Sequence, residues 1–196
     1  DRHCVKKQKA KPRKKQIIPH RVGIEERPRS YEDEYGHYEA DTFVSPKRSH
    51  SKVAVAVAVE RKARYVEMRK LLSLKPKYFA GAVREIREKV IMKSATLDNG
   101  LENRDHEAIG VETFFCDPYS SWQKGKAENM IHLVRRFVPK GTDLKFVSQK
   151  TLDEIADILN HKPRKSLPYR TPYEIMVEQN LFTNKKIPVG EIALQG

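Results

Sequence analysis

Three acidic residues, Asp41, Asp98 and Glu128, could together bind divalent metal ions. Cleavage and transfer of a phosphodiester require charge to be neutralised on both the attacking and the leaving oxygen, which two divalent ions about 3.5–4 Å apart can do. Magnesium prefers hard oxygen ligands and keeps several waters, so two or three Asp or Glu side chains on rigid elements are sufficient. Such a site requires that the elements carrying the three acids bring them together.

Each of the three acids also has an ordinary structural explanation. Asp41 lies in a predicted strand over residues 37–44, where Glu39 shares its face, so alternation alone does not choose between these two carboxylates. Asp98 begins a turn-forming Asp-Asn-Gly sequence, which explains it without catalysis. Glu128 falls in the first turn of a predicted helix, where a carboxylate complements the helix dipole. It is their order along the chain that makes them a candidate site.

Alternating and β-branched runs predict the strands that would position these acids. The run over residues 52–59 is almost continuously apolar, as expected for a central strand covered on both faces. One predicted strand precedes this run and another follows it, with no helix between them, which predicts an antiparallel meander of three strands. The predicted strands cover residues 37–44, 52–59, 65–69, 94–97 and 111–115.

Helical periodicity predicts one helix between the third and fourth strands and three more after the fifth. Pro139 ends the second helix, and Thr171 is the N-cap of the last. Strands interrupted by a helix indicate an α/β fold, here a mixed five-stranded sheet flanked by helices. The predicted helices cover residues 79–90, 125–138, 148–160 and 171–181.

Positive charge is concentrated at the start of the chain. The 196 residues carry 39 Lys and Arg against 26 Asp and Glu, a net charge of +13, and residues 1–30 alone have 11 basic and three acidic side chains, a net +8. Such a segment can release counterions from phosphates and bind nucleic acid without reading sequence, whereas the alternative is a solubilising tail. The basic side chains expected to contact DNA here are Lys6, Lys7, Lys9, Lys11, Arg13, Lys14 and Lys15.

The composition predicts one domain between two tails, namely a flexible basic leader over residues 1–30, a core over 31–182 and a tail over 183–196. Cys4 and Cys116 have no Cys or His at metal-ligand spacing, so neither a disulfide framework nor a zinc site is expected. No apolar run approaches about 18 residues and no export signal is present, which predicts a cytoplasmic protein without a membrane partner. The chain begins with a residue other than Met, so it is expected to be a piece of a longer protein.

Several motifs give the chain a family resemblance over roughly residues 20–180. They are Gly36-His37-Tyr38-Glu39-Ala40-Asp41-Thr42, Leu97-Asp98-Asn99-Gly100-Leu101-Glu102, and the segments 115–129, 135–143, 159–164 and 171–174. With these motifs the chain resembles the ribonuclease H-like catalytic domain of DDE transposases and retroviral integrases, and specifically the bacterial insertion sequence thirty family.

The resemblance implies a site and an activity. It assigns Asp41, Asp98 and Glu128 as the catalytic, metal-binding triad, which selects Asp41 over Glu39, and it implies two Mg²⁺ or Mn²⁺ ions as cofactors. The implied activity is that of a DNA transposase, with hydrolysis at the element end followed by strand transfer into target DNA. A helix-turn-helix region beside this domain, a homo-oligomer that pairs DNA ends and a bacterial, nucleoid-associated location are also implied.

Two motifs depart from the family pattern. Tyr38 replaces the usual Trp, which is a conservative aromatic change. Around Glu128, the usual Asn-Glu-Asn-Thr-Asn-Gly reads Ala-Glu-Asn-Met-Ile-His over residues 127–132. An inactive, DNA-binding remnant of a transposase is therefore an alternative to an active enzyme, and a nuclease of the same fold is a second one.

Side chains near the third acid are candidates for contact with DNA. Trp122 is expected to stack on a splayed base, and a place in the core is its alternative. His132 lies one helical turn after Glu128, where the alternative to phosphate contact is a solvated helix face. Glu102 either orients a metal-bound water or is an ordinary exposed loop acid. The predicted DNA contacts in this region are Trp122, Lys124, His132, Arg135 and Arg136.

Overall fold

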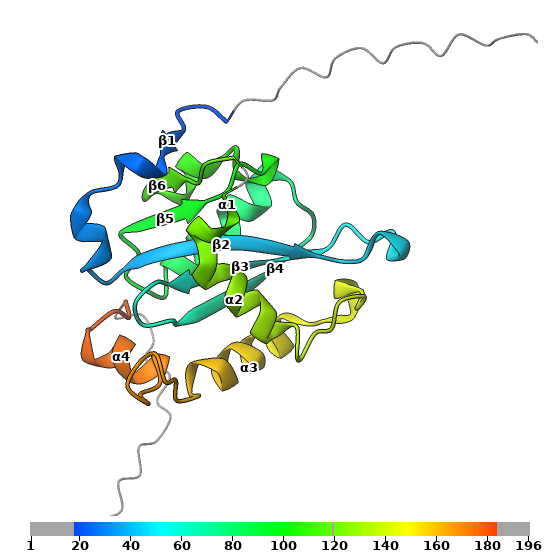
Figure 1. The fold of residues 1–196 in the computed structure, drawn as a ribbon. Helices are drawn as coiled ribbons and strands as arrows, with labels where there is room; N and C mark the ends of the chain where they lie inside the picture. The colour runs from blue at the N-terminus through cyan, green and yellow to red at the C-terminus, as the bar shows by residue number, and fades with distance from the viewer. Residues whose placement is uncertain (1–17, 119, 184–196) are drawn as a thin grey trace, which may run out of the picture.

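The computed structural model describes residues 18–118 and 120–183, and its centre is one six-stranded sheet (Figure 1). The strand order is β1-β6-β5-β2-β3-β4. β2, β3 and β4 form an antiparallel meander. On the other side of β2, the pairs β2–β5, β5–β6 and β6–β1 are parallel. The strands are β1 (Val22–Gly23), β2 (His37–Val44), β3 (Ala54–Glu60), β4 (Val66–Leu71), β5 (Ser94–Leu97) and β6 (Glu112–Phe115).

The five predicted strands and the meander are confirmed, and the sixth strand is the difference. β1 pairs with β6 through Val22 and Gly23, within the segment predicted to be a flexible leader. Ile18 and Ile24 flank this strand and are both buried, which fixes the segment against the sheet edge. A two-residue strand is too short to produce an alternating pattern, so the sequence contained no period that would have revealed it.

The four helices are divided between the two faces of the sheet (Figure 1). They are α1 (Pro76–Arg87), α2 (Gly125–Val134), α3 (Gln149–Asn160) and α4 (Pro172–Glu178). α2 is shorter than its predicted span of 125–138 because Arg136 and Phe137 bond to carbonyls three residues back and form tight turns instead. α4 also ends early, since Asn180 adopts a left-handed φ of 51°.

The interior strand β3 separates the two halves of the core. Its alanines, Ala54, Ala56 and Ala58, pack in the cluster that contains the buried face of α1. Its valines, Val55, Val57 and Val59, pack in the cluster that contains α2 and α3. Every residue of β3 is buried, which confirms the prediction of a strand covered on both faces.

The outer edge of β4 is covered by two carboxamide side chains of α3. Asn160 pairs with both polar backbone groups of Val66, accepting from its N–H and donating to its carbonyl, each at 2.9 Å. Gln149 accepts from the Lys70 N–H at 2.8 Å and donates to the Met68 carbonyl at 2.9 Å. Backbone groups that an edge strand would otherwise leave open are therefore satisfied from within the domain.

Among the helices of residues 18–118 and 120–183, none is both long enough and apolar enough to cross a bilayer. Cys116, at the end of β6, carries a free and buried thiol. Burial raises the pKa of this thiol to about 11, so it is protonated at neutral pH.

Candidate active site

Asp41 and Asp98 lie next to each other on adjacent parallel strands. In the register of β2 with β5, Glu39 pairs with Thr96, and the two aspartates each follow two residues later. β5 ends at Leu97, so Asp98 lies just beyond the carboxyl end of its strand, where ligand sites of parallel sheets usually form. Both aspartates line a cavity of about 920 Å³ to which Glu128 also contributes.

Each aspartate keeps one carboxylate oxygen directed at the same group. The Asp41 Oδ1 atom accepts from the Thr42 N–H at 2.7 Å, and the Asp98 Oδ1 atom accepts from Asn103 Nδ2, also at 2.7 Å. The Oδ2 atoms of Asp41 and Asp98 both lie 3.3 Å from the ammonium nitrogen of Lys124. Local hydrogen bonds thus orient the two carboxylates toward one cationic position.

Lys124 is buried, and its ammonium is held by three oxygens. Besides the two aspartates, it donates to the carbonyl of Ala40 at 3.3 Å. Burial alone would lower the pKa of Lys124, but the charges of Asp41 and Asp98 outweigh it and the pKa is raised. Burial also raises the pKa of Asp41, against the opposing effect of Lys124. The sequence predicted Lys124 as a DNA contact, whereas in the structure its ammonium points inward between the two acids.

Glu128 faces the same cavity from the first turn of α2 without joining the pair of aspartates. Its side chain is half exposed, and the Nε2 atom of His132 lies 4.0 Å from its Oε1 atom. Within the part of the chain that the structure describes, no three His, Cys, Asp or Glu side chains are close enough to hold a metal ion. Two of the three predicted ligands therefore converge, and the third lies on the rim of their cavity.

The chemistry of this donor set suits a hard divalent cation. Asp41 and Asp98 supply carboxylate oxygens, and an ammonium already occupies the position between them where positive charge is required. Glu102 adds a third carboxylate nearby, since Thr42 Oγ1 donates to it at 3.4 Å. Burial raises the pKa of Glu102, so it is not a plainly exposed loop acid.

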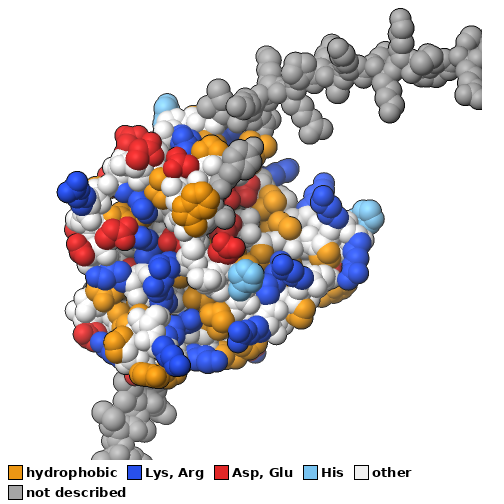
Figure 2. All heavy atoms as spheres, in the orientation of Figure 1, with side chains coloured by type: hydrophobic (Ala, Val, Ile, Leu, Met, Phe, Trp, Pro, Cys, Tyr) orange, Lys and Arg blue, Asp and Glu red, His pale blue; other side chains and the backbone are white. Residues whose placement is uncertain are grey.

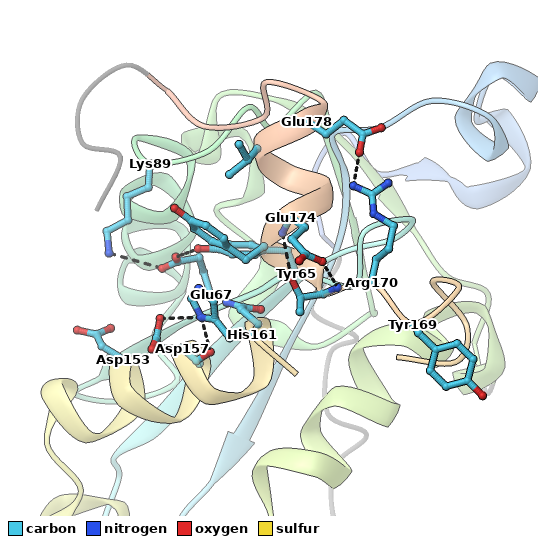
Figure 3. Close-up of a pocket in the computed structure, with 15 residues that line it drawn as sticks. Tyr65, Glu67, Lys89, Asp153, Asp157, His161, Tyr169, Arg170, Glu174 and Glu178 are labelled. Carbon is cyan, nitrogen blue, oxygen red and sulfur yellow. Dashed lines mark hydrogen bonds and ion pairs between the residues drawn. The ribbon is translucent and has the colours of Figure 1, made fainter. Parts of the chain in front are cut away.

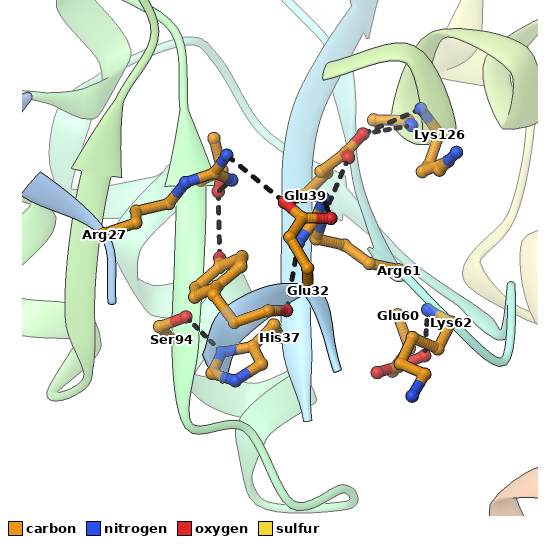
Figure 4. Close-up of polar contacts among 12 residues, drawn as sticks. Arg27, Glu32, His37, Glu39, Glu60, Arg61, Lys62, Ser94 and Lys126 are labelled. Atoms are coloured by element: carbon orange, nitrogen blue, oxygen red, sulfur yellow. Dashed lines mark hydrogen bonds and ion pairs between the residues drawn. The ribbon is translucent and has the colours of Figure 1, made fainter. Parts of the chain in front are cut away.

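Glu39 has a different task from Asp41, although both side chains project from the same face of β2. Its carboxylate accepts the backbone N–H groups of Lys126 and Ala127, at 2.8 and 3.0 Å, in the first turn of α2 (Figure 4). Its other oxygen lies 3.4 Å from Nε of Arg61. Because α2 carries Glu128, this buried anchor fixes the third acid relative to the strand that carries the first.

We expect replacement of Glu39 by Ala to lower the free energy of unfolding by about 2–4 kcal/mol, because two N–H groups of α2 lose their acceptor. A Gln at this position keeps one acceptor oxygen and should cost less. Denaturant unfolding followed by circular dichroism measures both. The matched control is Glu112→Gln, an exposed glutamate on β6, with a change within about 0.5 kcal/mol. Equal stability of E39A and E112Q would mean that α2 does not depend on this anchor.

Of the five DNA contacts predicted near the third acid, Lys124 lines the cavity and the other four are not among its lining residues. Trp122 is 73% exposed, so its alternative as a core anchor is wrong. His132 and Arg136 are exposed on the same helix and the turn that follows it. Arg135 is partly buried, with its guanidinium 4.5 Å from the ring centroid of Phe43. The predicted contacts of the leader, Lys6, Lys7, Lys9, Lys11, Arg13, Lys14 and Lys15, lie outside the described residues.

A larger cavity of about 1250 Å³ lies between β4, α3 and α4, but its polar groups are paired with one another (Figure 3). The Tyr65 hydroxyl donates to Glu67 at 3.0 Å, and His161 lies 3.1 Å from Asp157. Arg170 forms an ion pair with Glu178 at its mouth. Two of its carboxylates, Glu67 and Asp153, share the guanidinium of Arg69, whose Nη1 atom lies 3.3 and 3.4 Å from them. They come from an antiparallel strand and a helix, whereas Asp41 and Asp98 lie side by side on adjacent parallel strands, where ligand sites usually form, so the smaller cavity is the candidate site.

Sequence similarity connects this chain with three transposases. It is 36% identical over 181 residues to the transposase for insertion sequence element IS1086 of Cupriavidus metallidurans, covering 88% of this chain and 52% of that protein. It is 36% identical over 168 residues to the transposase for element IS4351 of Bacteroides fragilis, covering 81% of this chain and 50% of that protein. For transposase InsI of element IS30C of Escherichia coli, the identity is 36% over 165 residues, with coverages of 78% and 41%. The chain thus spans about half the length of the relatives it matches, and no family model matches it.

Among solved structures, the chain is similar to the catalytic core domain of BIV integrase, with a TM-score of 0.55 and 19% sequence identity. The match covers 74% of this chain and 95% of that domain. It confirms the predicted ribonuclease H-like fold, with a mixed sheet of six strands in place of five.

Proposed function

Because the chain is homologous to the transposases of the insertion sequence thirty family, we propose that it is a transposase catalytic core that cleaves and joins DNA. The observation that carries the proposal is the placement of Asp41 within β2 and of Asp98 just after β5, side by side on adjacent parallel strands, each with one carboxylate oxygen directed at the same cation. Unrelated acids on a protein surface would not be directed at one shared position. The cavity beside Asp41 and Asp98 is open to a substrate.

Asp41 and Asp98, with Glu128 across the cavity, are the residues that would hold Mg²⁺ or Mn²⁺. Two such ions, when bound, stabilise charge on the attacking and leaving oxygens of a phosphodiester. Lys124 balances the charge of the two aspartates and must share or give up these contacts when a divalent ion binds. Glu128, whose side chain is half exposed, would complete the set of ligands by approaching the aspartates.

Exposed side chains on α2 and in the segments on either side of it would position the DNA. Trp122 presents a large apolar surface for an unpaired base, and His132 and Arg136 present hydrogen-bond donors for phosphates. A water molecule first hydrolyses the phosphodiester at the element end, and the released 3′-hydroxyl then attacks target DNA in line. Neither step needs a covalent bond between the protein and DNA.

We propose that the longer protein, of which such a core is one part, recognises the element ends and pairs two of them. The relatives are about twice as long as this chain, so further parts of such proteins have room to read the terminal repeats. Two copies of the chain are the simplest assembly that brings two DNA ends together.

The test is a strand-transfer assay with labelled duplex ends. We expect Mg²⁺- or Mn²⁺-dependent nicking of intact ends, and joining of pre-nicked ends to a target duplex. Nicking without joining would identify a nuclease of the same fold. DNA binding without any metal-dependent product would identify an inactive remnant, an alternative favoured by the altered residues 127–132.

A further inference from the structure

The tip of the β2–β3 hairpin and the loop after α2 form one unit, which we call the basic lobe and define as residues 44–53 and 139–147. Ser45 joins the two segments, since its Oγ accepts from the Leu144 N–H at 3.1 Å and lies 3.4 Å from Asp143 Oδ1. Lys70 of β4 attaches the loop to the sheet by donating to the carbonyls of Lys145 and Val147, at 2.9 and 2.6 Å. The lobe is therefore a fixed extension of the sheet, beyond the end of β2 (Figure 1).

The basic lobe holds most of the excess positive charge that follows the leader. After residue 30 the chain has a net charge of 13 − 8 = +5 over 166 residues. The 19 residues of the lobe contain five basic side chains and one acidic one, a net +4, so the other 147 residues have only 5 − 4 = +1. The five basic residues are Lys47, Arg48, Lys52, Lys140 and Lys145.

These five side chains are exposed. None of them makes an ion pair with another residue in the part of the chain that the structure describes. The one acid of the lobe, Asp143, is already engaged, since it accepts from the Lys145 N–H at 2.9 Å and caps the turn that follows. Figure 2 shows Lys and Arg side chains gathered over this projecting part of the molecule. An exposed cluster of one sign without internal partners attracts a polyanion.

The lobe lies close enough to the candidate active site for one DNA duplex to contact both. β2 continues from Asp41 to Val44 and leads directly into Lys47, six residues after the aspartate. At about 3.3 Å per residue, the tip lies on the order of 15–20 Å from Asp41. Duplex DNA carries one charge per roughly 1.7 Å of its axis, so a duplex passing Asp41 presents about ten phosphates over that distance.

We propose that the basic lobe binds the sugar-phosphate backbone of duplex DNA flanking the phosphodiester that is cleaved. The inference rests on the proposed function, because DNA must lie beside Asp41 and Asp98 for its flank to reach the lobe. Duplex is favoured over single-stranded DNA because the lobe presents no Tyr or Trp and a single Phe, Phe146, whereas single-strand sites use several large stacking rings. Contact with phosphates alone carries no sequence preference.

The experiment measures binding of a labelled duplex in EDTA, by fluorescence anisotropy, over a range of salt concentrations. The triple variant Lys47→Gln/Lys52→Gln/Lys140→Gln removes three lobe charges. The matched control, Lys75→Gln/Lys77→Gln/Arg84→Gln, removes three exposed charges at or on α1, on the opposite face of the sheet. Circular dichroism melting of both variants checks that they fold.

The lobe variant is expected to lower the slope of log Kd against log salt by about 2–3, with affinity at least about tenfold weaker at 0.1 M salt, because each lost phosphate contact changes the slope by about 0.9. The control should leave the slope unchanged. Equal slopes for the two variants would overturn the proposal, and so would a loss confined to single-stranded DNA. Nicking by the unsubstituted chain is followed in parallel. If it cleaves DNA while the two slopes agree, the lobe assignment alone fails; if the lobe slope falls but no metal produces cleavage, the catalytic proposal fails instead.

Discussion

Replacing Asp41 by Asn is expected to reduce both nicking and strand transfer by about 10³-fold or more. The substitution keeps the size of the side chain and its hydrogen bond from the Thr42 N–H, but removes the negative charge that faces Lys124 at 3.3 Å. A divalent ion stabilises the transition state by several kcal/mol, and each 1.36 kcal/mol corresponds to a factor of ten in rate. Initial rates on labelled duplex ends in Mg²⁺ and in Mn²⁺ provide the measurement.

The control for this variant is Asp117→Asn, because Asp117 lines the same cavity but accepts a hydrogen bond from Gln123 at 2.9 Å instead of facing Lys124. It should retain its rate within a few fold. DNA affinity, measured without metal, should be similar for both variants. Full cleavage by D41N in Mg²⁺ would show that Asp41 is not a metal ligand, and the assignment of the triad would be wrong.

Replacing Lys124 by Met is expected to lower the free energy of unfolding in EDTA by about 2–3 kcal/mol. Loss of one partner of a buried ion pair costs about 3–5 kcal/mol, and the estimate is reduced here because the Asp98 side chain is 43% exposed. For a domain of this size the melting temperature should fall by about 4–12 °C. Added Mg²⁺ or Mn²⁺ should restore part of the loss, since a divalent ion replaces the missing positive charge.

A second substitution separates this electrostatic effect from a packing effect. In the double variant Lys124→Met/Asp98→Asn, one carboxylate charge is removed together with the ammonium. We expect it to be more stable in EDTA than K124M alone and to gain less from metal. Identical melting temperatures for K124M and the double variant, with no response to Mg²⁺ or Mn²⁺, would mean that repulsion between Asp41 and Asp98 is not what destabilises the single variant.

The elements that carry the site were predictable because their patterns extend over several residues. The alternation from His37 to Val44 and the apolar run of β3 set both strands and their order, and the apolar stripe of α1 set its buried face. The two-residue β1 was missed because its pairing depends on β6, which is distant in sequence. The end of α2 was misplaced because tight turns satisfy the same backbone groups as a further helical turn.

Within the candidate site, the sequence indicated which acidic residues to consider, but it did not indicate which groups their side chains contact. Asp41, Asp98 and Glu128, which the family motifs selected, line one cavity. Nothing in the pattern near Lys124 distinguishes an ammonium directed at solvent from one held between two acids, because that difference depends on the approach of α2 to β2. The same approach explains why Glu39, which has the parity of Asp41, is an anchor for a helix instead of a ligand facing the cavity.

The carboxamides of Asn160 and Gln149 restrict how copies of this chain can associate. They occupy backbone groups of β4 at Val66, Met68 and Lys70, so a strand from another molecule finds few free partners there. If copies of the chain pair two DNA ends as proposed, a continuous sheet across subunits through β4 is disfavoured. Copies brought close together on DNA would then be protected, at this edge, from the edge-to-edge strand pairing that leads to fibres.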